Sequence, residues 1–385
     1  MVVVTGEWAR SHRAGVLVAL ALLAAVALSA FVAHRSDRLF LAWSLAGLGL
    51  FVVQMAVGGL VALGGGPWGG LHAGLGAVSL GASAVTAALA LRSGAPAAAG
   101  AWRDYVTLMK PRIMSLLVLT GAGGLVLGAG GRPSAGLALA ALGGLALACG
   151  GASALNHVLD RDIDRLMGKR TQARPVAAGR VSPARALEFG LALLAASFVV
   201  LTSFVNVLAA LLALVGGAFY VLVYTRWLKR STPQNIVIGG AAGAVPPVVG
   251  WAAATGDLTL PALLLFLIVF FWTPPHFWAL ALLIRRDYEA AGVPMLPVVR
   301  GDAETARSIV RYTLALVAIS LLPVAAETVG LAYLVSALVL GAGFLALAVA
   351  LRRQTTPARA RRLFSYSLAY LALLFVALAV DPLVL

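Results

Sequence analysis

Long apolar runs recur along the whole of this chain, each close to the 20 or so residues that a helix needs to cross a bilayer. Hydrophobic residues make up 61% of the 385 positions and charged residues only 11%, with a mean hydropathy of +0.97. This composition excludes a water-soluble globule and predicts an all-α, multi-pass membrane protein. We expect twelve membrane-spanning helices, near residues 14–33, 39–63, 70–91, 113–130, 134–158, 184–204, 206–225, 234–253, 258–284, 308–325, 329–351 and 363–383.

A Gly-, Ala- and Pro-rich link around residues 93–101 separates the third run from the fourth. We therefore predict a three-helix membrane region over residues 1–100 and a nine-helix domain over 101–385. The first run resembles a signal sequence, but a second run follows almost at once, so we expect the first to be retained as a helix. The single cysteine, Cys149, lies in an apolar run, which indicates a structural thiol and no disulfide framework.

The formal net charge of +15 lies in short loops between the runs, so it favours anionic lipid headgroups and an anionic substrate over nucleic acid. We assign successive loops alternately to the two sides of the membrane. Of the 29 Lys and Arg residues, only Arg10, Arg13 and Arg132 then lie on the less basic side. Basic loops face the cytoplasm, so we expect both termini outside and the loop after Asn156 inside the cell.

The most chemically informative stretch lies where one run meets water. If the helix persists there, Asn156, Asp160 and Asp164 recur every fourth residue, drift by only about 40° per step and share one face. Oxygen ligands at this spacing suit Mg²⁺, which shares its coordination shell with substrate phosphates. The alternative is a loop with merely solvated charges. Three aspartates within five residues, in a chain with 14 acidic groups, favour the metal site.

Cations on the same predicted side are candidates for holding an anion. Lys169, Arg170 and Arg174 follow the acidic stretch, and Lys110 and Arg112 bracket a proline that opens the fourth run. Side chains of this type bind phosphate. The alternative for Lys110 and Arg112 is a positive-inside anchor.

Two later runs contain proline pairs. His276 follows Pro274-Pro275, and Asp287 falls on nearly the same helical face if that helix continues. An ionisable group within the membrane indicates a functional role, although His276 could instead be a packing histidine. In the preceding run, Gly239 and Gly243 lie one turn apart, which predicts close approach of a neighbouring helix.

Several motifs, taken together, resemble the heme-prenylating branch of the UbiA superfamily of intramembrane prenyltransferases. They are Asn156-x3-Asp160-x3-Asp164, Arg174-Pro175-x3-Gly179-Arg180-x-Ser182-Pro183, Thr232-Pro-Gln-Asn235, Pro246-Pro247-x2-Gly250-Trp251, Trp272-Thr-Pro-Pro-His276-Phe-Trp278 and Asp287-Tyr288-x3-Gly292-Val-Pro-Met-Leu-Pro297. The resemblance extends over about residues 105–383 and implies a nine-helix prenyltransferase bundle.

The resemblance also implies an activity: farnesyl transfer from farnesyl diphosphate to a vinyl group of heme b, with addition of water, to give heme O and diphosphate. It implies Mg²⁺ as cofactor. The implied metal ligands and catalytic residues are Asn156, Asp160, Asp164 and Asp287, with His276 orienting the porphyrin or handling a proton. Diphosphate or a heme propionate would be held by Lys110, Arg112, Lys169, Arg170 and Arg174. The second acidic motif of the family usually offers two carboxylates or more, whereas this chain offers Asp287.

Within the first 100 residues, Gln54-x3-Gly58-Gly59, the Gly64–Gly70 loop and Leu71-His72 resemble part of one half of a heme A synthase. This implies heme ligation by His72 and a partnership with heme A synthase or other oxidase-assembly proteins. The alternative for His72 is a ring that reaches the membrane surface or a backbone carbonyl.

Three other functions remain open from the sequence. A sister enzyme would prenylate a quinone-precursor ring. A non-enzymatic heme carrier would use His72 and His276 as ligands and would not need Asp160. A transporter would show inverted repeats, and we find none beyond the two acidic regions.

Overall fold

The computed structural model describes residues 101–384. The three spans and the region boundary expected within residues 1–100, together with His72, lie outside the described residues. Within 101–384, nine helical stretches are long and apolar enough to cross a membrane. The predicted nine-helix architecture is therefore confirmed for this part of the chain. These stretches are α5 (Pro111–Gly128), α6 (Ala135–Leu159), α9 (Pro183–Phe204), Val207–Ser231, α12 (Asn235–Thr255), α13 (Leu260–Leu283), α15 (Leu296–Ala325), α16 (Leu331–Arg353) and α17 (Pro357–Val384).

The stretch Val207–Ser231 changes its winding along its length. It consists of α10 (Val207–Ala218), a π-helix η1 (Phe219–Leu228) and a last turn, α11 (Lys229–Ser231). Four shorter helices complete the described fold: α4 (Ala101–Leu108), α7 (Arg161–Leu166), α8 (Lys169–Gln172) and α14 (Arg285–Ala290).

Two helices begin earlier than the apolar pattern predicts. Helix α15 begins at Leu296 rather than near 308, and α17 begins at Pro357 rather than near 363. The extra turns of α15 carry charged residues, which hydropathy assigns to a loop, and the chain bends at Gly301, where φ is +75°. Both helices therefore continue beyond their apolar segments.

Helix starts follow local sequence signals. The Ser134 hydroxyl accepts a hydrogen bond from the Leu137 N–H at the start of α6. Ser182 does the same for α9, with Pro183 in the first turn, and the Asn206 side chain caps α10. Each cap satisfies a backbone donor that the helix itself leaves unpaired.

Helices α12 and α13 form the centre of the described bundle. In each, 61% of the most apolar window is buried inside the protein, against 28% for α16. Helix α12 packs closely on α5 because glycines meet backbone there: a Cβ on Gly124 would lie 2.0 Å from the Pro247 carbonyl oxygen, and one on Gly250 would lie 1.9 Å from the Gly121 oxygen. Gly239 instead accommodates the ring of Tyr224 from η1. Of the two glycines predicted to allow close approach, Gly239 thus does so, whereas a Cβ on Gly243 would meet only the Thr273 hydroxyl at 4.0 Å.

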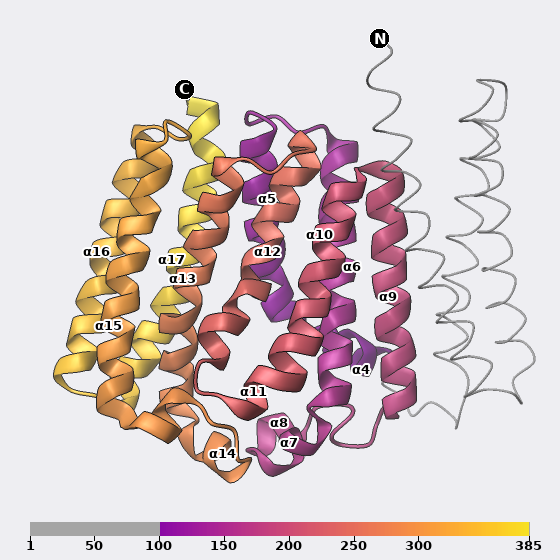
Figure 1. Cartoon of the computed structure of the whole chain (residues 1–385), viewed down its shortest axis with the longest axis vertical. Helices are drawn as coiled ribbons and strands as arrows, with labels where there is room; N and C mark the ends of the chain where they lie inside the picture. Colours follow the sequence, from indigo (N-terminus) through magenta and orange to yellow (C-terminus); the bar gives the residue numbers. More distant parts are fainter. Residues whose placement is uncertain (1–100, 385) are drawn as a thin grey trace, which may run out of the picture.

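The helices run side by side, and their connections gather at two ends (Figure 1). Helices α7, α8, α11 and α14 lie together at the lower end of the view, and the C-terminus lies at the upper end (Figure 1). Among the described residues, Arg132 is the one lysine or arginine in the upper connections. The lower end carries the basic residues and the acidic motifs.

Candidate active site

The first acidic motif lies where α6 passes into α7. Asp160 joins the two helices with φ −88° and ψ 0°, and the Asp160 and Asp164 N–H groups still donate to the carbonyls four residues earlier. The helical spacing therefore persists, and Asn156 Nδ2 donates to Asp160 Oδ2 at 2.8 Å. Asn156, Asp160 and Asp164 are only 2%, 1% and 1% exposed. Buried carboxylates of this kind need charged or hydrogen-bonding partners.

The π-helix η1 and the turn that follows it supply one set of partners. Lys229 Nζ lies 2.5 Å from Asp160 Oδ2, and Asn156 Nδ2 also donates to the Thr225 hydroxyl at 3.0 Å. That hydroxyl donates in turn to the carbonyl of Tyr220, five residues earlier. Wider winding of this kind is often found at functional sites. Here η1 carries Thr225 and ends immediately before Lys229.

Two sequence-predicted cations complete the cluster. Lys110 Nζ donates to Asn156 Oδ1 at 2.7 Å. Lys110 immediately precedes α5 and has the left-handed conformation (φ 53°). Arg174 donates to Asp164 Oδ1 at 2.7 Å. Burial lowers the pKa of the Lys110 ammonium to about 7, and the neighbouring Arg174 charge adds to this lowering. Lys110, Arg174 and Lys229 thus lie together with the two carboxylates in a space that excludes most water.

Each of the two buried carboxylates keeps one oxygen free. Asp160 Oδ1 and Asp164 Oδ2 are fully enclosed and have no hydrogen-bond partner, while burial raises the pKa of Asp164 against the opposing effect of Arg174. Unpaired buried carboxylate oxygens are costly unless a ligand completes them, and Mg²⁺ takes such oxygens. Within residues 101–384, no three His, Cys, Asp or Glu side chains converge on one point. These residues fit a metal ion that takes part of its coordination shell from substrate or water.

Asp287 approaches this cluster from the other half of the chain. Helix α13 ends at Leu283, and α14 begins after a break at Ile284 (φ −118°, ψ 30°). The condition for His276 and Asp287 to share a helical face is therefore not met. Asp287 instead lies against the loop between α7 and α8, because a Cβ on Gly168 would lie 2.6 Å from Asp287 Oδ2.

A small apolar cluster holds these lower-end segments together. It contains Ile163 and Met167 beside the first acidic motif, Ile236 of α12, and Tyr288 of α14. Burial raises the pKa of Tyr288 to about 12, and the charges on Asp160 and Arg174 are close enough to affect it. The two acidic regions thus meet in space through Tyr288.

His276 occupies a separate position between α13 and α17. It is 7% exposed, and its ring stacks on Trp272 and on Phe364, with centroid distances of 4.3 and 4.8 Å. Its Nδ1 lies 2.7 Å from the Ser367 hydroxyl. No contact between His276 and the Asp160 cluster occurs in the described structure.

Three predicted cations are not drawn into the cluster. Arg112, Lys169 and Arg170 are exposed, and none forms a side-chain ion pair with another described residue. Lys169 and Arg170 open α8 beside Gly168, so they flank the cluster from outside. Only Lys110 and Arg174 of the five contact the acidic motif.

Sequence reasoning missed Lys229 and Thr225. Both belong to the segment Tyr224-Thr-Arg-Trp-Leu-Lys-Arg230, whose basic residues look like an ordinary positive-inside anchor. The available signal was that Lys229 follows Tyr220, Tyr224 and Thr225 at the end of one apolar run. The spacing between Thr225 and Lys229 could not be related to Asp160 without the winding of η1.

Known proteins provide an independent comparison. A model of the UbiA prenyltransferase family matches residues 116–376. The chain is 47% identical to a protoheme IX farnesyltransferase of Roseiflexus sp. (strain RS-1), with 98% of this chain and 76% of the relative covered. It is 53% identical to a protoheme IX farnesyltransferase of Symbiobacterium thermophilum, with 72% of this chain and 94% of the relative covered.

Solved structures agree on the fold. One, from work on digeranylgeranylglyceryl phosphate synthase in membranes, matches with a TM-score of 0.62 at 19% identity, covering 74% of this chain and 99% of that one. A UbiA homolog from Archaeoglobus fulgidus bound to GPP and Mg²⁺ matches with a TM-score of 0.50 at 18% identity, covering 71% and 99%. The matched residues, the relatives and the shared bundle lead to one conclusion: this chain belongs to the UbiA prenyltransferase family.

Proposed function

We propose that this chain transfers the farnesyl group of farnesyl diphosphate to a vinyl group of heme b, with addition of water, giving heme O and diphosphate. The observation that carries the proposal is the pair of enclosed carboxylates, Asp160 and Asp164, each with one oxygen paired to a cation and one oxygen free. The relatives named protoheme IX farnesyltransferase support the acceptor and the prenyl chain.

The metal in this proposal is Mg²⁺, held by Asn156, Asp160 and Asp164, with Asp287 available for a second ion. The free oxygens of Asp160 and Asp164 are the hard donors that this ion prefers. When bound, Mg²⁺ neutralises charge that develops on the leaving diphosphate.

The basic side chains bind the leaving group. Arg174 and Lys229 already bond to the carboxylates and Lys110 to the Asn156 amide oxygen, so diphosphate oxygens can replace these oxygens as their partners. The three cations then stabilise negative charge on the departing oxygen as the allylic C–O bond breaks. Lys169 and Arg170, at the exposed rim, would attract the anion before it enters.

The acceptor alkene must meet the allylic carbon before water does. The enclosed position of the cluster limits stray water, which would otherwise trap the developing farnesyl cation. Heme b supplies the vinyl carbon that attacks, and water adds later to give the hydroxyethylfarnesyl group. His276 lies among aromatic rings that suit contact with a porphyrin face.

We also propose a cell-membrane location with the α7, α8 and α14 end in the cytoplasm. The scarcity of basic residues in the opposite connections supports this orientation. Residues 1–100 form a separate three-helix region in this proposal, and heme A synthase is a candidate partner that would receive heme O.

The test is a competition between acceptors. Membranes containing the protein are incubated with Mg²⁺, farnesyl diphosphate and either heme b or an aromatic acid, and products are analysed by mass spectrometry. We expect heme O from heme b and no prenylated acid. Product from the acid alone would assign the chain to quinone-precursor prenylation, and binding of heme without any product would indicate a carrier.

A further inference from the structure

The Ser367 side chain forms two short contacts at once. Its hydroxyl lies 2.7 Å from the Phe364 carbonyl, to which it donates, and 2.7 Å from His276 Nδ1. A serine hydroxyl has one proton, and that proton goes to the carbonyl, which can only accept. Nδ1 must therefore carry the proton in the bond between His276 and Ser367, because two lone pairs at this distance would repel.

The opposite ring nitrogen is left as an acceptor. With the proton on Nδ1, the neutral ring has its lone pair on Nε2. Nε2 has no partner among the described residues and is not one of their fully enclosed polar atoms. Stacking on Trp272 and Phe364 prevents the ring from turning away. His276 thus presents an unprotonated nitrogen in a fixed direction.

We propose that Ser367 is a positioning residue, which fixes the tautomer and direction of His276 so that Nε2 is offered to the iron of bound heme b. A metal-binding histidine commonly donates its other N–H to an oxygen in this way. Trp272 Nε1 donates to the Ser367 backbone oxygen at 2.7 Å, so the contact between α13 and α17 survives loss of the hydroxyl. This inference rests on the proposed function, which supplies heme b as substrate.

The experiment compares two buried serines. Ser367→Ala removes the acceptor for His276, whereas Ser320→Ala removes a hydroxyl that contacts Tyr370 between α15 and α17. Both serines are 0% exposed, and each hydroxyl forms two hydrogen bonds, one of them to a carbonyl of its own helix, so the two variants lose similar packing and the same number of hydrogen bonds. Purified protein is titrated with ferric heme b, and binding is monitored by the position of the Soret band. KM for farnesyl diphosphate is measured in parallel.

We expect Ser367→Ala to weaken heme b binding about tenfold and to shift the Soret band, with KM for farnesyl diphosphate unchanged. Ser367→Thr, which keeps the hydroxyl, restores native binding, and Ser320→Ala binds heme b normally. Native heme binding and spectrum in Ser367→Ala, with both lost in His276→Ala, would overturn the role of Ser367. No heme b binding by the native protein would instead contradict the proposed function.

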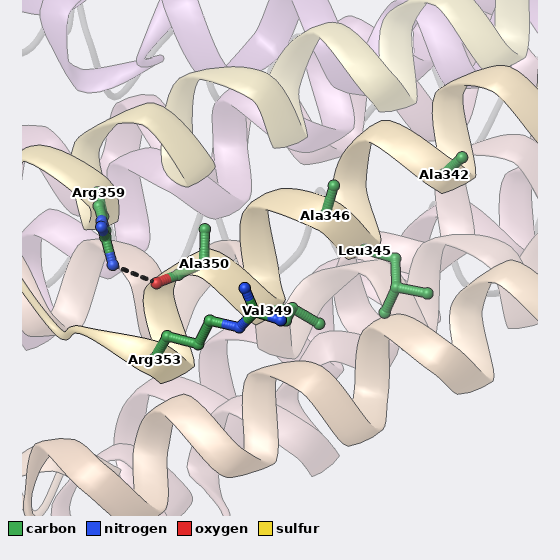
Figure 2. A pocket seen from close by; sticks show the side chains of 7 residues that line it. All are labelled: Ala342, Leu345, Ala346, Val349, Ala350, Arg353 and Arg359. Carbon is green, nitrogen blue, oxygen red and sulfur yellow. Dashed lines mark hydrogen bonds between the residues drawn. The ribbon is translucent and has the colours of Figure 1, made fainter.

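A second, independent observation concerns a groove along α16. An open groove of about 550 Å³ is lined by small and apolar side chains and ends at Arg353 (Figure 2). Its apolar lining, Ala342, Leu345, Ala346 and Val349, recurs at helical spacing along one stripe of α16. A stripe of this shape suits an acyl chain lying along the helix.

The charge at the groove's end suits an anionic headgroup. Arg359 donates to the Ala350 carbonyl at 2.7 Å and so completes the end of α16 (Figure 2). Arg353 has no ion-pair partner among the described residues, and the chain contains no Asp or Glu between residues 328 and 380. Arg361 and Arg362 line a second groove on the same helical hairpin.

We propose that the groove ending at Arg353 binds an anionic phospholipid of the adjacent leaflet. Native mass spectrometry of the purified protein, titrated with phosphatidylglycerol or phosphatidylcholine, tests this. One arginine near a headgroup favours the anionic lipid by roughly fivefold, and Arg353→Gln removes that preference. Arg132→Gln, at the opposite end, keeps it.

A substitution that fills the groove on α16 provides a second test of this proposal. Ala346→Trp blocks the acyl chain and lowers binding of phosphatidylglycerol, whereas Val339→Trp, at a position on α16 that is 65% exposed and outside the groove, leaves it unchanged. Equal binding of the two lipids, or native lipid binding by both Arg353→Gln and Ala346→Trp, would overturn the proposal.

Discussion

Asp287 lies directly against Gly168: a Cβ built on Gly168 would come within 2.6 Å of Asp287 Oδ2. These residues belong to regions far apart in the sequence, one following the first acidic motif and one within the second. Gly168 has φ −63° and ψ 164°, an extended conformation open to any residue. Its lack of a side chain is therefore explained by the nearby carboxylate.

Gly168→Ala should displace Asp287 without straining its own backbone. We expect kcat/KM for farnesyl diphosphate to fall about 10- to 100-fold, since small displacements of positioning groups have effects of this size. Gly136→Ala is the matched control, because a Cβ at that helical glycine meets nothing within 4 Å. Equal activity of the two variants would remove Asp287 from the site.

Lys229 should matter as much as the cations visible in the sequence. Lys229→Gln removes the ammonium beside Asp160, so we expect KM for farnesyl diphosphate to rise about 10- to 100-fold, the value of a charge-assisted hydrogen bond. Arg230→Gln breaks the pair with the exposed Asp162 and a hydrogen bond to the Leu159 carbonyl, neither of which involves Asp160, and should change KM by less than about threefold. Steady-state kinetics with both variants would reject the assignment if their KM values were equal.

Metal removal should stop the reaction reversibly. Chelation with EDTA should abolish product formation, and added Mg²⁺ should restore it. Asp164→Asn weakens a hard oxygen donor, so its half-saturating Mg²⁺ concentration should rise about tenfold. Full activity after exhaustive chelation would contradict a metal-bound diphosphate.

The sequence could predict the bundle and the first acidic motif because each depends on local spacing. Apolar length defined the spans, and the four-residue period placed Asn156, Asp160 and Asp164 on one face, where Asn156 does bond to Asp160. Neither Lys229 nor Gly168 could be found in this way. Their roles depend on the winding of η1 and on how α14 meets the loop after α7, which are tertiary features.

The helix break at Ile284 is another feature that sequence spacing did not predict. Hydropathy extended the sixth span of this domain to residue 284, and a continuous helix would have put Asp287 near the face of His276. The backbone leaves the helical conformation at Ile284 instead, so His276 faces α17 while Asp287 turns toward Gly168. No single-residue propensity in this apolar segment predicts that break.

The close contact between α5 and α12 should contribute strongly to the stability of the described bundle. Gly250→Ala would place a methyl group 1.9 Å from the Gly121 carbonyl oxygen, and overpacking of this kind destabilises by about 3 kcal/mol. We expect the thermal unfolding midpoint in detergent to fall by roughly 5 to 10 °C. Gly143→Ala, which meets nothing within 4 Å, should leave the midpoint unchanged or raise it. Equal midpoints would mean that this close contact does not limit the stability of the bundle.

The central claim is that the enclosed Asp160 carboxylate supports farnesyl transfer to heme b. Mass spectrometry of hemes extracted from cells that express the native chain, Asp160→Asn or Asp162→Asn tests it most directly. Asp162 is the matched control, since it belongs to the same motif but pairs with Arg230 at the surface. We predict heme O with the native chain and with Asp162→Asn, and at least about 100-fold less heme O with Asp160→Asn. Native levels of heme O with Asp160→Asn, or no heme O with the native chain, would contradict the account.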